Sequence, residues 1–179
     1  MELVYEIGKC VAKADLVLRD GLTAAYTKVG GTFRKINFQA GTLKEIAETL
    51  NDWSKSDTLR YEKMPIVCLL TPFEIASLAG SELPQAKFTL FTACATEPNL
   101  KRYQRQVKTF EPILNPIVTE TIRQIIASHA FQAYELDVRY KLIEHDYWAK
   151  DRQKSIFNEY VDAVETRDFT INLSLSHCS

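Results

Sequence analysis

The chain has 179 residues, the length of one domain with a sizeable core. Its 46% hydrophobic and 25% charged residues are ordinary for a globular fold, and the net charge of −1 argues against a protein that grips nucleic acid along its whole surface. No apolar run approaches the roughly 20 residues of a membrane span. Charges interrupt the N-terminal stretch every few positions, unlike a signal peptide. We therefore expect a single domain over residues 1–179, made in the cytoplasm, with no membrane partner.

The first predicted elements are a helix, a strand and a second helix. Apolar residues recur at helical spacing over residues 2–19, which predicts an amphipathic helix that ends before Gly21. A short strand is expected over 32–38. Thr42 and Glu45 then have the spacing of a capping box, so a helix should begin there and run to about residue 54.

Two apolar runs, 64–71 and 86–96, are hydrophobic on both faces, which is typical of interior strands. A long helical stripe follows from about 104 to 128. Because Pro112 and Pro116 interrupt this stripe, we expect a kink or a restart of the helix there.

The C-terminal third alternates apolar and polar residues, which predicts strands near 135–143 and 168–175. The pattern favours an α+β fold. We expect a mostly antiparallel sheet of about four to five strands, an N-terminal helix, and a long helix packed on one face. Three long polar connections are candidates for extended arms that order on assembly: 20–31, 52–63 and 72–85.

The four cysteines give no sign of a metal site. Cys68 and Cys94 lie in strand-like runs, where a thiol serves as a small core residue, while Cys10 and Cys178 stand alone in sequence. No nucleophile elbow, phosphate loop or zinc-protease motif is present. We therefore expect no cofactor, no metal and no catalytic residue.

One group of carboxylates leaves an alternative open. Asp146, Glu159 and Asp162, with His145 nearby, could converge as a metal or acid–base cluster, as in a small metal-dependent hydrolase or nuclease. Their spacing is not diagnostic, so we favour turn and edge residues around Trp148.

A basic cluster and an aromatic cluster are candidates for interfaces. The basic cluster puts four cations within two helical turns with no acid between them: Lys101, Arg102, Arg105 and Lys108. It could touch phosphates, but a solvated face or a contact with an acidic neighbouring subunit is the favoured interpretation. Tyr147 and Trp148 lie among crowded aromatics. Such crowding is usually core, although Tyr and Trp also favour interfaces.

The run from residue 157 onward has the composition of a structural corner. Phe157 and Tyr160 supply apolar anchors, while Asn158 and Asp162 can bond to nearby backbone groups and turn the chain into its last strand. Such a corner needs no reactive group.

Four runs stand out along the chain: "YEKMPIVCLL", "FTLFTACATE", "RQVKTFEPILNPIVTETIRQI" and "HDYWAKD…SIFNEYVDAVETRDFTINL". Together they resemble head–tail connector, tail-completion or tail-terminator-like structural proteins of tailed phages and prophages of Bacteroidota-type hosts. The resemblance covers about residues 60–175 and is most specific over 157–165.

The resemblance implies a non-enzymatic virion protein that forms a homo-oligomeric ring at the portal–tail junction. Its implied partners are other copies of itself, the portal, and other connector or tail proteins, with DNA as passing cargo. A strongly basic bore would hold phosphates. We therefore predict that the basic cluster avoids the channel axis and pairs with acidic residues of another chain.

Overall fold

The computed structural model describes residues 3–59, 62–76, 84–132, 138–148 and 157–173. None of the helices in these ranges is long and apolar enough to cross a bilayer. The elements follow in this order along the chain: α1 (Leu3–Lys28), β1 (Asn37–Gly41), α2 (Leu43–Ser54), β2 (Ile66–Ala76), β3 (Gln85–Ala95), α3 (Arg102–Arg105), the π-helix η2 (Gln106–Leu114), α4 (Asn115–Ile126), β4 (Phe131–Gln132), β5 (Arg139–His145) and β6 (Val161–Leu173).

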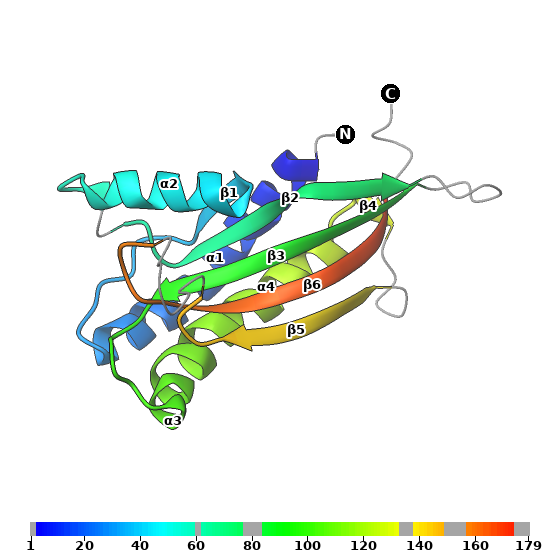
Figure 1. Ribbon diagram of the computed structural model, residues 1–179. Helices are drawn as coiled ribbons and strands as arrows, with labels where there is room; N and C mark the ends of the chain where they lie inside the picture. Colours follow the sequence, from blue (N-terminus) through cyan, green and yellow to red (C-terminus); the bar gives the residue numbers. More distant parts are fainter. Residues whose placement is uncertain (1–2, 60–61, 77–83, 133–137, 149–156, 174–179) are drawn as a thin grey trace.

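The strands form one mixed sheet in the order β1-β2-β3-β6-β4, with β5 also paired to β6 (Figure 1). The α+β class and the N-terminal helix are confirmed. The sheet is mixed and not mostly antiparallel as predicted. β1 pairs with β2 in parallel, and the other described pairings are antiparallel. The cause is α2, which carries the chain from β1 back to the start of β2 as a crossover helix.

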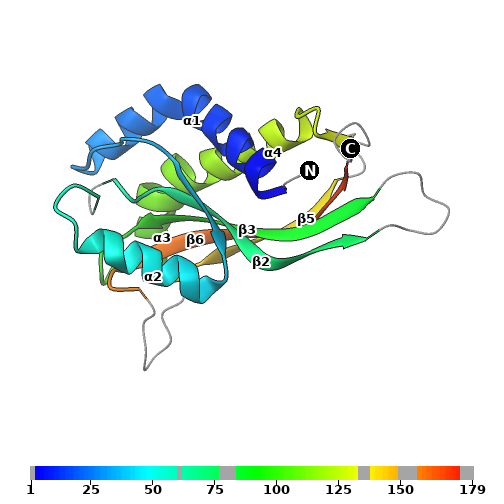
Figure 2. The same cartoon turned by 90° about the horizontal axis from the view of Figure 1, so that it is seen from above.

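Helices cover both faces of the sheet, with α1 and α4 on one face and α2 on the other (Figure 2). The larger core lies under α1 and α4 and contains Ile7, Leu90, Phe110, Ile117 and Phe169. The burial of these large apolar side chains removes them from water and supplies most of the driving force that holds the layers together.

The second core lies under α2. It contains Ile46 and Leu50 of α2 and Phe91 of β3, together with Trp148 and Phe157. The ring of Trp148 stacks on Phe91 with centroids 4.3 Å apart and lies 5.1 Å from the ring of Phe157. Such pairs add to the energy of area burial.

The N-terminal helix is longer than predicted. It passes through Gly21 to Lys28, so most of the expected arm over 20–31 is helical. A glycine inside a helix costs roughly 0.5–1 kcal/mol. The burial of Leu22 and the packing of Tyr26 against the core offset that cost.

The capping box of α2 is confirmed. The Thr42 hydroxyl accepts from the Glu45 amide at 3.3 Å, and the Glu45 carboxylate accepts from the Thr42 amide at 2.7 Å. The preceding strand begins at Asn37 instead of residue 32, although Phe33 and Ile36 are already buried.

The central strands are interior, as predicted: β2 lies between β1 and β3, and β3 lies between β2 and β6. β2 is longer than expected and runs to Ala76, while β3 has the expected length, so most of the described part of the predicted arm 72–85 belongs to these two strands. Residues 77–83 lie outside the described residues. In the predicted arm 52–63, α2 extends to Ser54 and residues 60–61 lie outside the description.

The expected long helix over 104–128 is divided into α3, η2 and α4. Pro112 lies inside η2 and has no N–H to donate, so a widened π-helical turn accommodates it. The Asn115 N–H donates to the Phe110 carbonyl, and the helical path continues without a break. One long helix packed on the sheet was therefore not found, and α4 packs mainly against α1.

The last strand was also predicted too short. It begins at Val161 instead of residue 168. The prediction missed the first part of the strand because buried polar residues such as Asp162 and Thr166 interrupt the alternation of apolar and polar residues there. The strand predicted over 135–143 corresponds to β5, which begins at Arg139. Residues 135–137 and 174–175 lie outside the described part of the chain.

Candidate functional site

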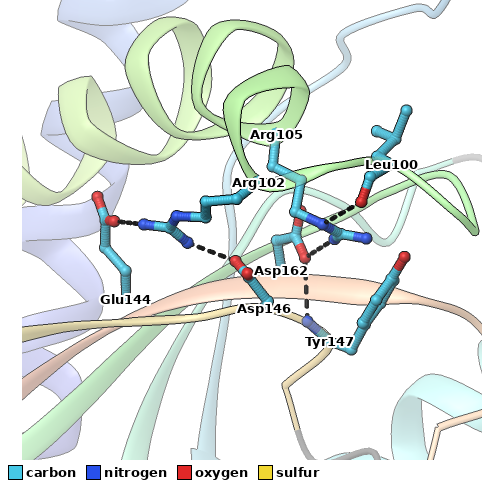
Figure 3. Close-up of polar contacts among 7 residues, drawn as sticks. All are labelled: Leu100, Arg102, Arg105, Glu144, Asp146, Tyr147 and Asp162. Carbon is cyan, nitrogen blue, oxygen red and sulfur yellow. Dashed lines mark hydrogen bonds and ion pairs between the residues drawn. The ribbon is translucent and has the colours of Figure 1, made fainter.

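A buried ion pair joins the start of the α3–η2 helical run to β6 (Figure 3). The side chains of Arg105 and Asp162 are 1% and 0% exposed, and Nη1 of Arg105 donates to Oδ1 of Asp162 at 2.5 Å. The Arg105 Nε donates to the Leu100 carbonyl at 3.1 Å. One charge-assisted contact therefore holds together two segments that lie far apart in the sequence.

The turn after β5 completes this pair. The Tyr147 N–H donates to Oδ1 of Asp162 at 3.1 Å, and the Arg105 guanidinium lies 3.6 Å from the centre of the Tyr147 ring. Nη2 of Arg105 and Oδ2 of Asp162 make no hydrogen bond within the described residues. Because both ions are desolvated, loss of either partner would leave the other as an uncompensated buried charge.

A second arginine clamps the same region from the surface. Arg102 is half-exposed and pairs through Nη2 with Glu144 and through Nη1 with Asp146 (Figure 3). Its guanidinium also lies 4.7 Å from the centre of the Phe110 ring. The two arginines together tie α3 to β5 and to β6.

The basic cluster therefore finds most of its acids within its own chain. Besides Arg102 and Arg105, Lys108 pairs with Glu97 at 3.4 Å. Lys101 is exposed and makes no ion pair in the described ranges. The prediction that acids of another subunit neutralise all four cations does not fit Arg105, which is buried against Asp162.

The two aromatic candidates differ in position. The Trp148 side chain is buried in the second core, and the backbone N–H of Trp148 donates to the Val161 carbonyl at 2.6 Å. Tyr147 is half-buried and packs edge-on against Tyr160, with ring centroids 5.2 Å apart. Trp148 thus contributes to the packing of its own chain, and Tyr147 covers the Arg105 guanidinium.

The predicted corner residues lie where the chain enters β6. Phe157 is buried in the second core, and the Asn158 N–H donates to the Asn51 side chain of α2 at 3.0 Å. The Tyr160 carbonyl accepts from the Thr96 N–H at 2.9 Å. Backbone contacts to α2 and to the segment after β3 therefore direct the chain into the strand that holds Asp162.

The three carboxylates of the hydrolase alternative are not brought together as a ligand set. Each lies against a different cation: Asp146 against Arg102, Glu159 against Lys63 at 2.6 Å, and Asp162 against Arg105. Across the part of the chain that the structure describes, no group of three or more His, Cys, Asp or Glu side chains could hold a metal ion.

One charged cluster was missed by the sequence interpretation. Glu165 is buried on β6 and accepts from Arg167 at 2.5 and 2.8 Å and contacts His145 Nε2 at 2.7 Å. Burial raises the pKa of Glu165, but the hydrogen bonds from Arg167 and His145 outweigh it, so the pKa is lowered. The pairing of β5 with β6 brings His145 next to Glu165, and no local sequence pattern predicts that pairing.

Comparison with known proteins adds no assignment to this geometry. No family model matches the chain, and no curated protein matches it significantly.

Proposed function

We propose that this chain is a non-enzymatic virion structural protein that forms a homo-oligomeric ring at the portal–tail junction of a tailed phage. It would act as a head–tail connector, tail-completion or tail-terminator-like subunit. The observation that carries the proposal is the sequence resemblance over about residues 60–175, which is strongest at 157–165. In the structure the described part of that stretch runs from the second core into β6.

The polar groups of the candidate site support a structural role. Asp162 and Arg105 are buried and neutralise each other. Arg102 forms ion pairs with Glu144 of β5 and with Asp146 of the following turn. Groups held in this way stabilise the fold and are not poised as a nucleophile with a base.

The charge distribution is compatible with DNA as passing cargo. Three cations of the basic cluster are neutralised within the chain, which leaves fewer positive charges to hold phosphates. The proposed partners are other copies of the chain, the portal, and neighbouring connector or tail proteins, and the proposed location is the tail or portal vertex of the virion.

Sedimentation velocity of the purified full chain, with negative-stain microscopy of the same sample, tests the proposal. We expect one closed species of uniform size. A monomer over the whole accessible concentration range would contradict the ring. Saturable metal-dependent nuclease activity lost in Asp146→Asn would contradict the non-enzymatic role.

A further inference from the structure

An apolar groove lies between α4 and β5 on the face of the sheet that α1 and α4 cover. Its volume is about 630 Å³, and its apolar lining consists of Val118, Ile122, Ile126, Val138, Tyr140 and Leu142. Tyr140 and Leu142 are 41% and 54% exposed, although they are large hydrophobic residues. Two exposed large apolar side chains beside an apolar groove are typical of an interaction site, whereas scattered single residues are not.

The strand that borders the groove is an edge strand. Among the described strands β5 pairs only with β6, so its other side presents backbone N–H and C=O groups to a partner. Arg139 and Lys141 place two cations in the first half of this strand. A strand added there would extend the sheet and cover the groove at the same time.

The opposite side of the same sheet has a second open edge. β1 pairs with β2 only over Ile66–Leu70, so residues 74–76 of β2 have β3 on one side and no strand on the other within the described residues. These residues are exposed, and Ile75 is 52% exposed. Figure 1 shows β2 and β5 toward opposite edges of the sheet.

The two edges match in the faces that their side chains occupy. Ile75 lies opposite Ala86, which is buried in the core under α1 and α4, so Ile75 lies on the α1–α4 face of the sheet, as the groove does. Glu74 lies opposite Lys87 on the other face. Lys87 and Lys141 both pair with Asp168, so Lys141 shares that face with Glu74.

We propose that residues 74–76 of β2 in one copy dock along β5 of the next copy, with Ile75 over the α4–β5 groove and Glu74 near Lys141. The occupant is a second copy of this chain because one sheet carries both complementary edges, with an apolar residue, an acid and a base at matching faces. The inference rests on the proposed ring. Since the two surfaces differ, the contact is head-to-tail, which closes into a ring when the rotation allows.

Two exposed residues give variants that separate the surfaces. Ile75→Asp alters the β2 edge, and Leu142→Asp alters the groove. Leu16→Asp is the matched control, because Leu16 is 71% exposed and belongs to α1 and to neither edge strand. Far-ultraviolet circular dichroism and thermal unfolding should show that all three variants fold.

Sedimentation velocity then reads the contact. Ile75→Asp and Leu142→Asp should each weaken self-association about thirtyfold or more, as expected for a central apolar anchor, while Leu16→Asp assembles as the wild type does. An equimolar mixture of Ile75→Asp and Leu142→Asp keeps one intact contact per pair of copies. It should form dimers and no larger species.

A charge exchange tests the register on the other face. Glu74→Lys and Lys141→Glu should each weaken assembly, and the double variant should recover much of it, because every contact then regains an opposite-charge pair. A wild-type ring that persists in Ile75→Asp or Leu142→Asp, or a double variant worse than both single variants, would overturn the docking but leave the proposed ring intact. A monomeric wild type would overturn both.

Discussion

Removal of the Asp162 carboxylate would leave the Arg105 guanidinium buried without its counter-ion. Both side chains are excluded from solvent, so water cannot replace the lost partner. Breaking a buried ion pair in this way costs about 3–5 kcal/mol of unfolding free energy. For a domain of this size each kcal/mol shifts the melting temperature by roughly 2–4 °C, so Asp162→Ala should lower it by roughly 6–20 °C.

Urea unfolding followed by tryptophan fluorescence measures this loss, because Trp148 lies in a core that unfolding exposes. Arg102→Ala is the control, since Arg102 makes its ion pairs at the surface of the same cluster. Such surface pairs contribute about 1 kcal/mol or less. The denaturant slope should stay equal in both variants, which shows that the cost lies in stability and not in the compactness of the unfolded chain.

A double variant separates the charge effect from simple loss of packing. Arg105→Met with Asp162→Leu removes both ions and retains apolar volume, so it should be clearly more stable than Asp162→Ala alone. A cost below about 1 kcal/mol for Asp162→Ala, or a double variant as unstable as the single one, would refute the uncompensated-charge reasoning.

Three further outcomes are expected. Trp148→Ala should cost about 3–5 kcal/mol by urea unfolding, because the ring fills the second core. The pKa of Glu165 is lower in the folded chain than its ordinary value of 4.5. Ionised Glu165 therefore stabilises the fold at pH values above 4.5, and this stabilisation is lost as the pH falls through the pKa of the folded state. The stability gap between wild type and Glu165→Gln should therefore narrow from about pH 7 to about pH 3.5. The thiols of Cys10, Cys68 and Cys94 should not react with a thiol reagent until the chain unfolds. Burial keeps them from the reagent and raises their pKa.

Local patterns predicted the elements whose stability is local. The Thr42–Glu45 capping box marked the start of α2 because both of its hydrogen bonds lie within one turn. The apolar character of the central runs placed β2 and β3 inside the sheet because burial on both faces leaves few polar positions. The helix α1 ran past Gly21 because Leu22 is buried by tertiary contacts that the local pattern does not contain.

Long-range pairing explains the failures. The basic cluster has no acid between its members, and the acids that pair with its two arginines come much later in the chain: Asp146 lies 44 positions after Arg102, and Asp162 lies 57 positions after Arg105. The same separation explains why Asp162 was predicted to be a turn residue and not part of β6. The cation that neutralises Asp162, Arg105, lies 57 positions earlier in the chain. The pairing of β5 with β6 places Glu144 and Asp146 beside the strand that carries Asp162, so the two arginines meet acids from both segments.

The cluster at α3 and the groove beside α4 belong to one mechanical arrangement. Among the described strands β5 pairs with β6 alone and would be held weakly by that ladder by itself. Arg102 joins Glu144 of β5 and Asp146 of the following turn to α3, and α3 continues through η2 into α4, the other wall of the groove. Arg105 anchors the same helical run to β6. Two cations that the sequence suggested as an interface therefore join the helical run that forms one wall of the groove to the strands on the other side, and this groove is the surface proposed to receive the next copy.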